Sequence, residues 1–344
     1  MKNVLLIAPS WNGLHLDIIN GLMAKGYHVE YFPELSFKDD PLRIKAHSFF
    51  PMRKSKAEIK KSIYWENLFS NTATFFDFLI VVDGQGVNRT VFEELRKRNE
   101  NIYMVNYLYD TTYSMYHFEE NFCYFNRVYT FDNKDASNYN IKLLPIYWDK
   151  SEMEKSNVPQ IAVFGLGAYS ANRYRLYHQV KKISDDMGKK SFIKLYAPQQ
   201  NYSISRKMKN RVKELLGRHD YVPYKIYQSD LFTSQLIPTD EFRQYVHMAD
   251  VILDTNVLNQ DGLTARFMWA LGAGKKIITT NSSVYNYVFY NPEQILVLKD
   301  TLFTESEKDV IKNFINAQIS LSKEHTLIVE KFRLDNWLET LLTS

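Results

Sequence analysis

A chain of 344 residues is too long for one small core and fits two domains of ordinary size. Hydrophobic residues make up 45% of it and charged residues 24%, values that exclude a disordered or collagen-like protein. The formal net charge of +4 lacks the strong basic excess of a nucleic-acid-binding protein, although a mildly positive protein suits a small anionic substrate.

The first apolar run, NVLLIA, stops after a few residues at a Pro-Ser turn signal, so it predicts a strand and not a signal peptide. No apolar stretch approaches the roughly 20 residues that cross a bilayer. Cys123 is the single cysteine and cannot form an internal disulfide. We therefore expect a cytoplasmic protein.

The first half of the chain alternates short apolar runs with segments of helical periodicity. This alternation is typical of a parallel sheet covered by helices. Strands are predicted at 3–10, 28–34, 76–84, 101–110, 127–132 and 142–148.

The polar segment at 149–160 ends in proline, has no apolar period and is predicted to be a linker. The same alternation then begins again. Strands are predicted at 160–167, 191–200, 249–256, 275–281 and 294–300, with helices beginning near Ala171, Ile204, Thr239, Asp261 and Thr304.

Two such series in succession predict an α/β protein with two facing Rossmann-like domains. Ligands of these sheets bind beyond the carboxyl ends of the strands, so the residues that follow each strand are site candidates. They are Asn12, Gly13, Asp83, Gly84 and Asp110 in the first half, and Gly165, Gly167, Asp254 and Thr280 in the second.

The stretch FGLGAYSANR places Gly165 and Gly167 between a strand and a helix, with Ser170 where a third glycine would complete a dinucleotide fingerprint. A turn without side chains lets backbone amides approach a phosphate, and Arg173 would add a charge. The next strand ends in LYAPQQ without the carboxylate that a nicotinamide cofactor requires. Phosphate contact and ordinary turn glycines both fit this loop.

The stretch NQDGLTARFMWALGAGKKIITTN, residues 259–281, is more specific. Asp261 is predicted to cap a helix whose first turn, Gly262 to Thr264, leaves free amides for a phosphate. Helical spacing puts Arg266 and Trp269 on one face, where the arginine would hold a diphosphate and the ring would lie beside the sugar or base. A surface arginine stacked on a partly buried tryptophan is the alternative.

This stretch, preceded by ADVILDTN, resembles the donor-binding segment of glycosyltransferases with the GT-B fold. It is most similar to the bacterial group of spore-maturation-type and capsule or lipopolysaccharide cluster glycosyltransferases, with a family 1/4-like C-terminal domain. The likeness extends to YLYDTTYS, to NRVYTFDNKDASNYNIKLLPIYWD and to FGLGAYSANRY. It implies that a second domain holds a nucleotide-sugar donor, that a first domain holds the acceptor, and that no further cofactor is needed.

The chain departs from this group at one position. Many of these enzymes carry two glutamates with seven residues between them, and the second accepts hydrogen bonds from the donor ribose. Asp261 and Trp269 stand at the corresponding positions here. Because an indole offers no acceptor, the tryptophan stacks on the nucleotide, or the donor is unusual, or the site is idle.

The donor-site candidates combine the two motifs with the strand ends. They are Gly13, Gly165, Gly167, Ser170, Arg173, Asp254, Gln260, Gly262, Leu263, Thr264, Arg266 and Trp269. No Asp-x-Asp occurs and no histidines show zinc-ligand spacing, so we expect arginines and helix termini to balance the diphosphate without a metal. Asp110 is the first candidate for the general base, followed by Asp83 and His15.

Residues 49–65 mix basic and aromatic side chains, which suits contact with an anionic membrane and a lipid-linked acceptor. A solvated helix with a few packed aromatics is the commoner origin of such a segment. The expected domains are 1–150 for the acceptor and 151–328 for the donor, with a terminal helix at 329–344 that packs back on the first domain.

We therefore expect a metal-independent glycosyltransferase, cytoplasmic or peripheral at the inner face of the membrane. It would move a sugar from a nucleotide donor to a glycan or lipid-linked acceptor in bacterial surface polysaccharide or glycoconjugate synthesis. The polysaccharide role follows from the resemblance alone. Two alternatives stay open: a sugar-nucleotide epimerase on the same fold, and a non-catalytic partner subunit of a glycosyltransferase complex.

Overall fold

The computed structural model describes residues 1–10, 13–34, 62–70, 72, 75–84, 86–113, 118–149, 160–197, 208, 212, 230–256, 260–299 and 303–343. Four expectations lie wholly or mostly outside these residues. They concern Asn12, the helix near Ile204, the linker at 149–160 and the basic segment at 49–65.

The chain forms two compact units. Unit 1 consists of Met1–Tyr147, Asn259–Gly262 and Lys331–Ser344, and unit 2 of Trp148–Leu258 and Leu263–Glu330. The chain therefore returns to unit 1 twice after it has entered unit 2.

Unit 1 contains a parallel sheet in the order β2-β1-β3-β4-β5-β6 among the described residues. Its strands are β1 (Asn3–Ala8), β2 (His28–Pro33), β3 (Phe78–Val82), β4 (Tyr103–Leu108), β5 (Arg127–Thr130) and β6 (Lys142–Leu143). Every residue of β3 is buried, as expected for a central strand that helices cover on both faces.

The last predicted strand of this half is shorter than expected. Instead of 142–148, only Lys142–Leu143 pairs with β5, and the amide of Leu144 donates to the Thr130 carbonyl at 2.8 Å. Pro145 follows immediately, and proline has no amide hydrogen to continue a ladder.

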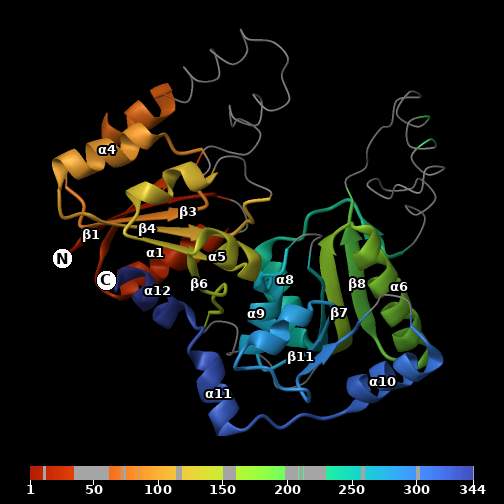
Figure 1. Cartoon of the computed structure of the whole chain (residues 1–344). Helices are drawn as coiled ribbons and strands as arrows, with labels where there is room; N and C mark the ends of the chain where they lie inside the picture. Colours follow the sequence, from red (N-terminus) through yellow and green to blue (C-terminus); the bar gives the residue numbers. More distant parts are fainter. Residues whose placement is uncertain are drawn as a thin grey trace. The chain divides into compact units, whose positions relative to one another are not determined.

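The helices of unit 1 come from both ends of the chain. They are α1 (Leu14–Ala24), α4 (Arg89–Arg98), η2 (Phe118–Tyr124), α5 (Asn133–Tyr139) and α12 (Leu334–Leu342), and residues 62–70 are also helical. The dark blue α12 lies beside the red α1 in Figure 1, and a Cβ built on Gly21 of α1 would lie 2.6 Å from a methyl of Leu338.

Two packed groups of side chains stabilise unit 1. Strand residues such as Leu79 and Met104 pack with Trp65 and Phe92 in one of them. On α12, Trp337 is 1% exposed, and its ring lies 4.7 Å from Tyr107 and 5.0 Å from Tyr147.

Unit 2 repeats the architecture with a parallel sheet in the order β12-β11-β10-β7-β8-β9. Its strands are β7 (Ile161–Ala168), β8 (Ser191–Tyr196), β9 (Phe232–Thr233), β10 (Ala249–Asp254), β11 (Lys276–Thr279) and β12 (Ile295–Val297). Its helices are α6 (Ala171–Asp186), α8 (Thr239–Met248), α9 (Ala265–Gly272), η5 (Ser282–Asn286), α10 (Glu305–Asn316) and α11 (Lys323–Glu330).

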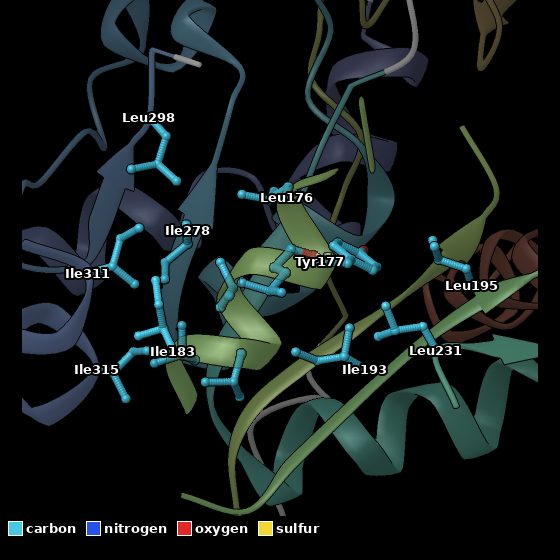
Figure 2. Packing of buried hydrophobic residues seen from close by; sticks show 14 residues of the cluster. Leu176, Tyr177, Ile183, Ile193, Leu195, Leu231, Ile278, Leu298, Ile311 and Ile315 are labelled. Carbon is cyan, nitrogen blue, oxygen red and sulfur yellow. Dashed lines mark hydrogen bonds between the residues drawn. The ribbon is translucent and has the colours of Figure 1, made fainter. Parts of the chain in front are cut away.

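The core of unit 2 joins its sheet to α6 and α10. Figure 2 shows Leu176, Tyr177 and Ile183 of α6 among strand residues such as Ile193 and Ile278, with Ile311 of α10 beside them. The predicted helix starts near Ala171, Thr239 and Thr304 are confirmed, and Thr304 caps α10 through a reciprocal bond with Glu307.

The order of the strands marks one place in each sheet where the direction of winding reverses. In unit 1 the reversal falls between β1 and β3, and in unit 2 between β7 and β10. Open α/β sheets bind ligands in the crevice beyond the carboxyl ends of such strands. Most of the candidate residues follow these four strands or β4.

Candidate functional site

Asp254, the last residue of β10, lies at the reversal point of unit 2 and is fully buried. Its Oδ1 accepts hydrogen bonds from Thr264 Oγ1 at 2.7 Å and from Arg266 Nε at 3.1 Å. Its Oδ2 accepts one from Thr279 Oγ1 at 3.3 Å. The carboxylate therefore connects the end of β10 with the start of α9 and the end of β11.

Arg266, in the first turn of α9, pairs with this carboxylate, and its side chain is 10% exposed. Its Nη1 also donates to the carbonyl of Leu166 on β7. Burial lowers the pKa of Arg266, but Tyr177 and Asp254 raise it by more, so the net direction is upward. The guanidinium stays charged.

Arg173 of α6 reaches the same place from the other side of the reversal point. Its Nε donates to Thr255 Oγ1 at 2.8 Å, its Nη2 to the Thr255 carbonyl at 3.4 Å, and its Nη1 to the carbonyl of Ala168. Burial, followed by the neighbouring charge of Arg266, lowers the pKa of Arg173. Through its hydrogen bonds, Arg173 links the end of β7 to Thr255, the residue after β10.

The two guanidinium groups meet at Gly167. A Cβ built on this glycine would lie 3.0 Å from Nη1 of Arg173 and 3.0 Å from Nη1 of Arg266. Two arginines and the single carboxylate of Asp254 leave this cluster with an excess of one positive charge. Such a cluster, at the carboxyl ends of β7 and β10, favours an anionic ligand.

The predicted turn glycines have different surroundings from those expected. Gly165 and Gly167 both lie within β7 and not in a turn after it. A Cβ on Gly165 would lie 3.2 Å from Leu253 and from the Tyr177 ring, so this glycine permits close packing of α6 and β10 on β7. Ser170 caps α6 by accepting a hydrogen bond from the Arg173 amide at 3.2 Å.

Asp261 does not cap α9 as the sequence predicts. The cap is Thr264, whose hydroxyl accepts from the Phe267 amide at 3.1 Å, and α9 begins at Ala265. The amides of Asp261 and Gly262 instead donate to Oδ2 of Asp132 within unit 1, at 2.6 Å and 2.9 Å.

Gly262 is also held by packing, because a Cβ on it would lie 2.4 Å from the Phe131 ring. The predicted free amide for a phosphate is therefore occupied in this structure. Gln260 lies in the same segment of unit 1, whereas Leu263 is fully buried at the start of the next segment of unit 2.

Trp269 lies on α9 but does not stack on Arg266. It is 5% exposed, its ring packs edge-on against Phe242 at 5.7 Å, and the guanidinium over its face belongs to Arg243 of α8, at 4.7 Å. Its Nε1 has no hydrogen-bond partner among the described residues. The cation and ring pair that the sequence offered as the alternative is thus present with a different arginine, from α8, which precedes α9 in the chain.

Gly13 and His15 follow β1 at the reversal point of unit 1. Gly13 has a φ of 70°, precedes α1 as its cap residue, and has open space where a Cβ would point. The His15 ring stacks on Tyr31 at 4.9 Å, and burial lowers its pKa although Asp17 opposes the shift. His15 is therefore a neutral imidazole near neutral pH.

Asp83 follows β3 and Asp110 follows β4. The two residues lie together, as expected for residues at the carboxyl ends of adjacent parallel strands. Oδ1 of the buried Asp83 accepts from the amides of Tyr109 at 2.7 Å and of Asp110 at 3.1 Å. Asp110 is exposed. Burial raises the pKa of Asp83 well above its usual range, and the charges of Asp110 and Glu34 add to this effect.

Three polar residues at strand ends were not among the predicted site residues. Glu34 follows β2, Thr255 follows β10 and Thr279 ends β11. Each stands at the carboxyl end of a predicted strand or within two residues of it, so the rule that selected Asp83 and Asp254 also applies to them.

Among the described residues no group of three or more histidine, cysteine, aspartate or glutamate side chains is placed to hold a metal ion. Within the same residues, no helix is long and apolar enough to span a bilayer. Of the segment at 49–65, residues 62–65 are described. Among them Trp65 is 2% exposed and donates to the Gly86 carbonyl at 2.9 Å, so it belongs to the core.

Comparison with solved structures places the fold. The N-terminal domain of trehalose-6-phosphate phosphatase from Candida albicans matches with a TM-score of 0.56 at 13% identity, covering 98% of this chain and 97% of that one. The α,α-trehalose 6-phosphate synthase of Burkholderia multivorans matches with a TM-score of 0.55 at 9% identity, covering 99% and 97%. The chain therefore has the GT-B fold, with two Rossmann-like domains built on parallel six-stranded sheets.

No protein-family model matches the sequence, and a search of curated proteins found no significant relative. At such low identities the structural neighbours establish the fold and leave the chemistry to be argued from the residues.

Proposed function

We propose that this protein is a glycosyltransferase that transfers a sugar from a nucleoside-diphosphate donor bound to unit 2. The main support for this proposal is a pair of buried arginines, Arg173 and Arg266, that flank Gly167 at the reversal point of the sheet. The leaving diphosphate is the anion that offsets their excess charge. A neighbour of the same fold is an α,α-trehalose 6-phosphate synthase, which supports glycosyl transfer as the chemistry.

The roles of the residues follow from their positions. Arg266, held by Asp254, and Arg173, held by Thr255, present fixed donors where negative charge develops as the glycosidic bond to the diphosphate breaks. Because these charges are fixed in place, we propose that transfer proceeds without a metal ion. Asp110, exposed at the end of β4, takes the proton from the acceptor hydroxyl.

We further propose, from the sequence resemblance, that the acceptor is a glycan or lipid-linked sugar of a bacterial surface polysaccharide or glycoconjugate. An enzyme of this kind works in the cytoplasm or at the inner face of the membrane. The donor base and sugar are to be identified by the binding experiment that follows.

The test is calorimetric titration of the protein with UDP, GDP, dTDP, CDP and ADP, and then with the matching nucleotide sugars. One diphosphate should bind selectively, and Arg266→Ala should weaken it by about 1–3 kcal/mol, the range for a lost hydrogen bond to a charged group. Arg175→Ala is the matched control. Arg175 lies two residues after Arg173 on α6 and is exposed, and its replacement removes the same charge as Arg266→Ala.

Arg266→Ala leaves the buried carboxylate of Asp254 unpaired, which can cost about 3–5 kcal/mol of stability. The double variant Asp254→Asn with Arg266→Ala removes both charges and keeps an acceptor for Thr264. Equal affinity in the double variant and the parent would refute the role of Arg266. Turnover that disappears with a chelator and returns with magnesium would refute the metal-free mechanism.

A second candidate function is a non-catalytic partner subunit of a glycosyltransferase complex, and Trp269 favours it. This residue stands where related enzymes use a glutamate on the donor ribose, and here it is buried against Phe242 and Arg243. Under this alternative no nucleotide raises the melting temperature of the parent, whereas Trp269→Glu gains a nucleotide-dependent shift. A selective shift in the parent supports the transferase instead.

A further inference from the structure

Three carboxylates stand at the carboxyl ends of β2, β3 and β4 in unit 1, and they differ in exposure. In the sheet β3 and β4 are adjacent, and β1 lies between β2 and β3. Glu34 follows β2 and is 9% exposed, Asp83 follows β3 and is 6% exposed, and Asp110 follows β4 and is exposed. The two buried side chains bond to main-chain amides. This difference separates the residues that organise the edge of the sheet from the one that faces solvent.

Asp83 connects the turn after β3 to the turn after β4. Its Oδ1 accepts from the amides of Tyr109 and Asp110, at 2.7 Å and 3.1 Å, and its own amide donates to the Tyr107 carbonyl at 2.8 Å. Asn106 Nδ2 donates to its carbonyl at 3.1 Å. The backbone of Asp110 is thus fixed by the side chain of Asp83, which follows the adjacent strand β3.

The backbone of Asp83 adopts a conformation that few residues with a side chain accept. Its φ is 58°, in the left-handed region that glycine, asparagine and aspartate tolerate best. This conformation lets the carboxylate turn back toward the Tyr109 and Asp110 amides. Surrounding bonds must therefore hold the turn in place.

Glu34 supplies those bonds from β2. Its Oε2 accepts from the Gly84 amide at 3.1 Å and its Oε1 from the Gly86 amide at 2.8 Å. Each of these two carboxylates thus fixes the turn after the strand that comes next in the chain. Glu34, after β2, fixes the turn at Asp83, and Asp83, after β3, fixes the turn at Asp110.

We propose that Asp83, supported by Glu34, is a positioning residue that fixes the turn carrying Asp110, and that Asp110 is the carboxylate presented to the acceptor. The role of Asp110 as the base rests on the proposed glycosyl transfer. The positioning of Asp110 by Asp83 can be tested without any substrate.

The electrostatics of the edge agree with this division of roles. Burial is the largest cause of the raised pKa of Asp83. The charges of Asp110 after β4 and Glu34 after β2 face this carboxyl and raise its pKa further. Desolvation by the surrounding chain also raises the pKa of Asp110, although its side chain is open to solvent. A base must be deprotonated, so turnover falls as the pH falls through this raised pKa, at a pH above the ordinary value of about 3.9.

The substrate-free test measures amide exchange at residues 109 and 110 and titrates Asp110 by the ¹³C shift of its carboxyl group, assigned with Asp110→Asn. Asp83→Asn keeps Oδ1 and tolerates the positive φ, so exchange and the Asp110 pKa should match the parent. Asp83→Gly also fits the backbone but lacks the acceptor. It should speed exchange by about tenfold or more and return the Asp110 pKa toward its ordinary value.

Unchanged exchange and titration in Asp83→Gly would overturn the positioning role. Glu34→Gln gives a graded control, because the amide side chain keeps one of the two oxygens that hold Gly84 and Gly86. It should produce a smaller change in the same direction as Asp83→Gly.

The activity test uses the nucleotide sugar that the calorimetric panel selects. Asp110→Asn should lower kcat by about 100-fold or more, as expected for a general base. Asp83→Asn should keep kcat within about threefold and leave the acid limb of the pH profile in place, because it preserves the acceptor. A loss in Asp83→Asn as large as that in Asp110→Asn would make Asp83 a catalytic residue and overturn the proposal.

The two proposals fail in distinguishable ways. If no nucleotide binds, the transferase proposal fails, while exchange and carboxyl titration still decide whether Asp83 positions Asp110. If a nucleotide binds and Asp83→Gly leaves the turn unchanged, the transferase proposal stands and the positioning role fails.

Discussion

Asp254 and Lys276 are buried charged side chains whose partners come largely from the helices that pack on the sheet of unit 2. Asp254 is matched by Arg266 and two threonine hydroxyls, whereas Lys276 is matched largely by main-chain carbonyls. Lys276 is 1% exposed at the start of β11. Its Nζ donates to the carbonyls of Phe314, Ile315 and Ala317, at 3.0, 2.8 and 2.6 Å, where α10 ends.

Replacing Lys276 should therefore destabilise unit 2. Lys276→Met leaves these carbonyls without their donor and Asp250 without its partner at 2.8 Å, so the free energy of unfolding should fall by about 3 kcal/mol. Denaturant unfolding followed by tryptophan fluorescence measures the change.

The adjacent lysine provides the control. Lys275 Nζ donates to one carbonyl, that of His247, at 2.7 Å, so Lys275→Met should cost clearly less. Equal losses for the two variants would contradict the capping of α10 by Lys276.

At the scale of elements, helices in both units approach their neighbours through glycines. Gly272 ends α9, and a Cβ on it would lie 2.3 Å from the Trp148 ring, which is fully buried and donates from Nε1 to the Val329 carbonyl at 2.9 Å. Gly21 of α1 has a tight contact too, but with the methyl end of Leu338. A fixed ring and a flexible methyl respond differently to an added Cβ.

Gly272→Ala should accordingly destabilise the protein by about 1–3 kcal/mol through overpacking, although alanine favours helix by about 1 kcal/mol over glycine. Gly21→Ala should be close to neutral, because Leu338 can change rotamer while α1 gains helix propensity. Thermal unfolding of the two variants tests the contrast. A stabilised Gly272→Ala would show that Trp148 moves freely.

At the scale of the whole molecule, the order along the chain differs from the grouping in space. The last helix, α12, follows unit 2 in sequence but belongs to unit 1, where Trp337 packs against Tyr107 and Tyr147. Hydrogen bonds from Tyr129 Oη to the Thr340 carbonyl, at 3.1 Å, and from Tyr103 Oη to the Thr343 carbonyl, at 3.4 Å, add to this packing.

A defect in α12 should therefore be felt at the other end of the sequence. Trp337→Ala removes a buried ring and should cost about 3–5 kcal/mol. Amide exchange should rise in α1 and β4 but stay unchanged in α6 and β7. Trp337→Phe, which keeps a ring, is the control, and a loss of protection confined to α10 and α11 would contradict the assignment of α12 to unit 1.

Local patterns predicted much of the fold and part of the candidate site. Buried runs such as FLIVV at 78–82 indicated parallel strands, and the alternation with helical segments indicated helix starts near Ala171 and Thr304, which the structure confirms. Polar residues at strand ends indicated Asp83 and Asp254, because parallel strands bring their carboxyl ends to one edge.

Partners distant in sequence were decided by the tertiary structure alone. Aspartate is a residue type that often caps helices, yet the amide of Asp261 donates to the carboxylate of Asp132, and Thr264 caps α9 instead. Trp269 stacks with Arg243 because α8 packs beside α9, a pairing that helical spacing within 259–281 could not indicate.

The sequence by itself thus determined the described strands other than β9, three helix starts in unit 2 and the class of fold, because these depend on neighbours along the chain. The tertiary structure decided that Arg173 and Arg266 meet at Gly167, and that Asp83 bonds the amides of Asp110 and its neighbour. The arginines meet where the strand order reverses between β7 and β10, and Asp83 reaches Asp110 because β3 and β4 are adjacent in the sheet. Side chains separated by many residues approach one another there only after the sheet has formed.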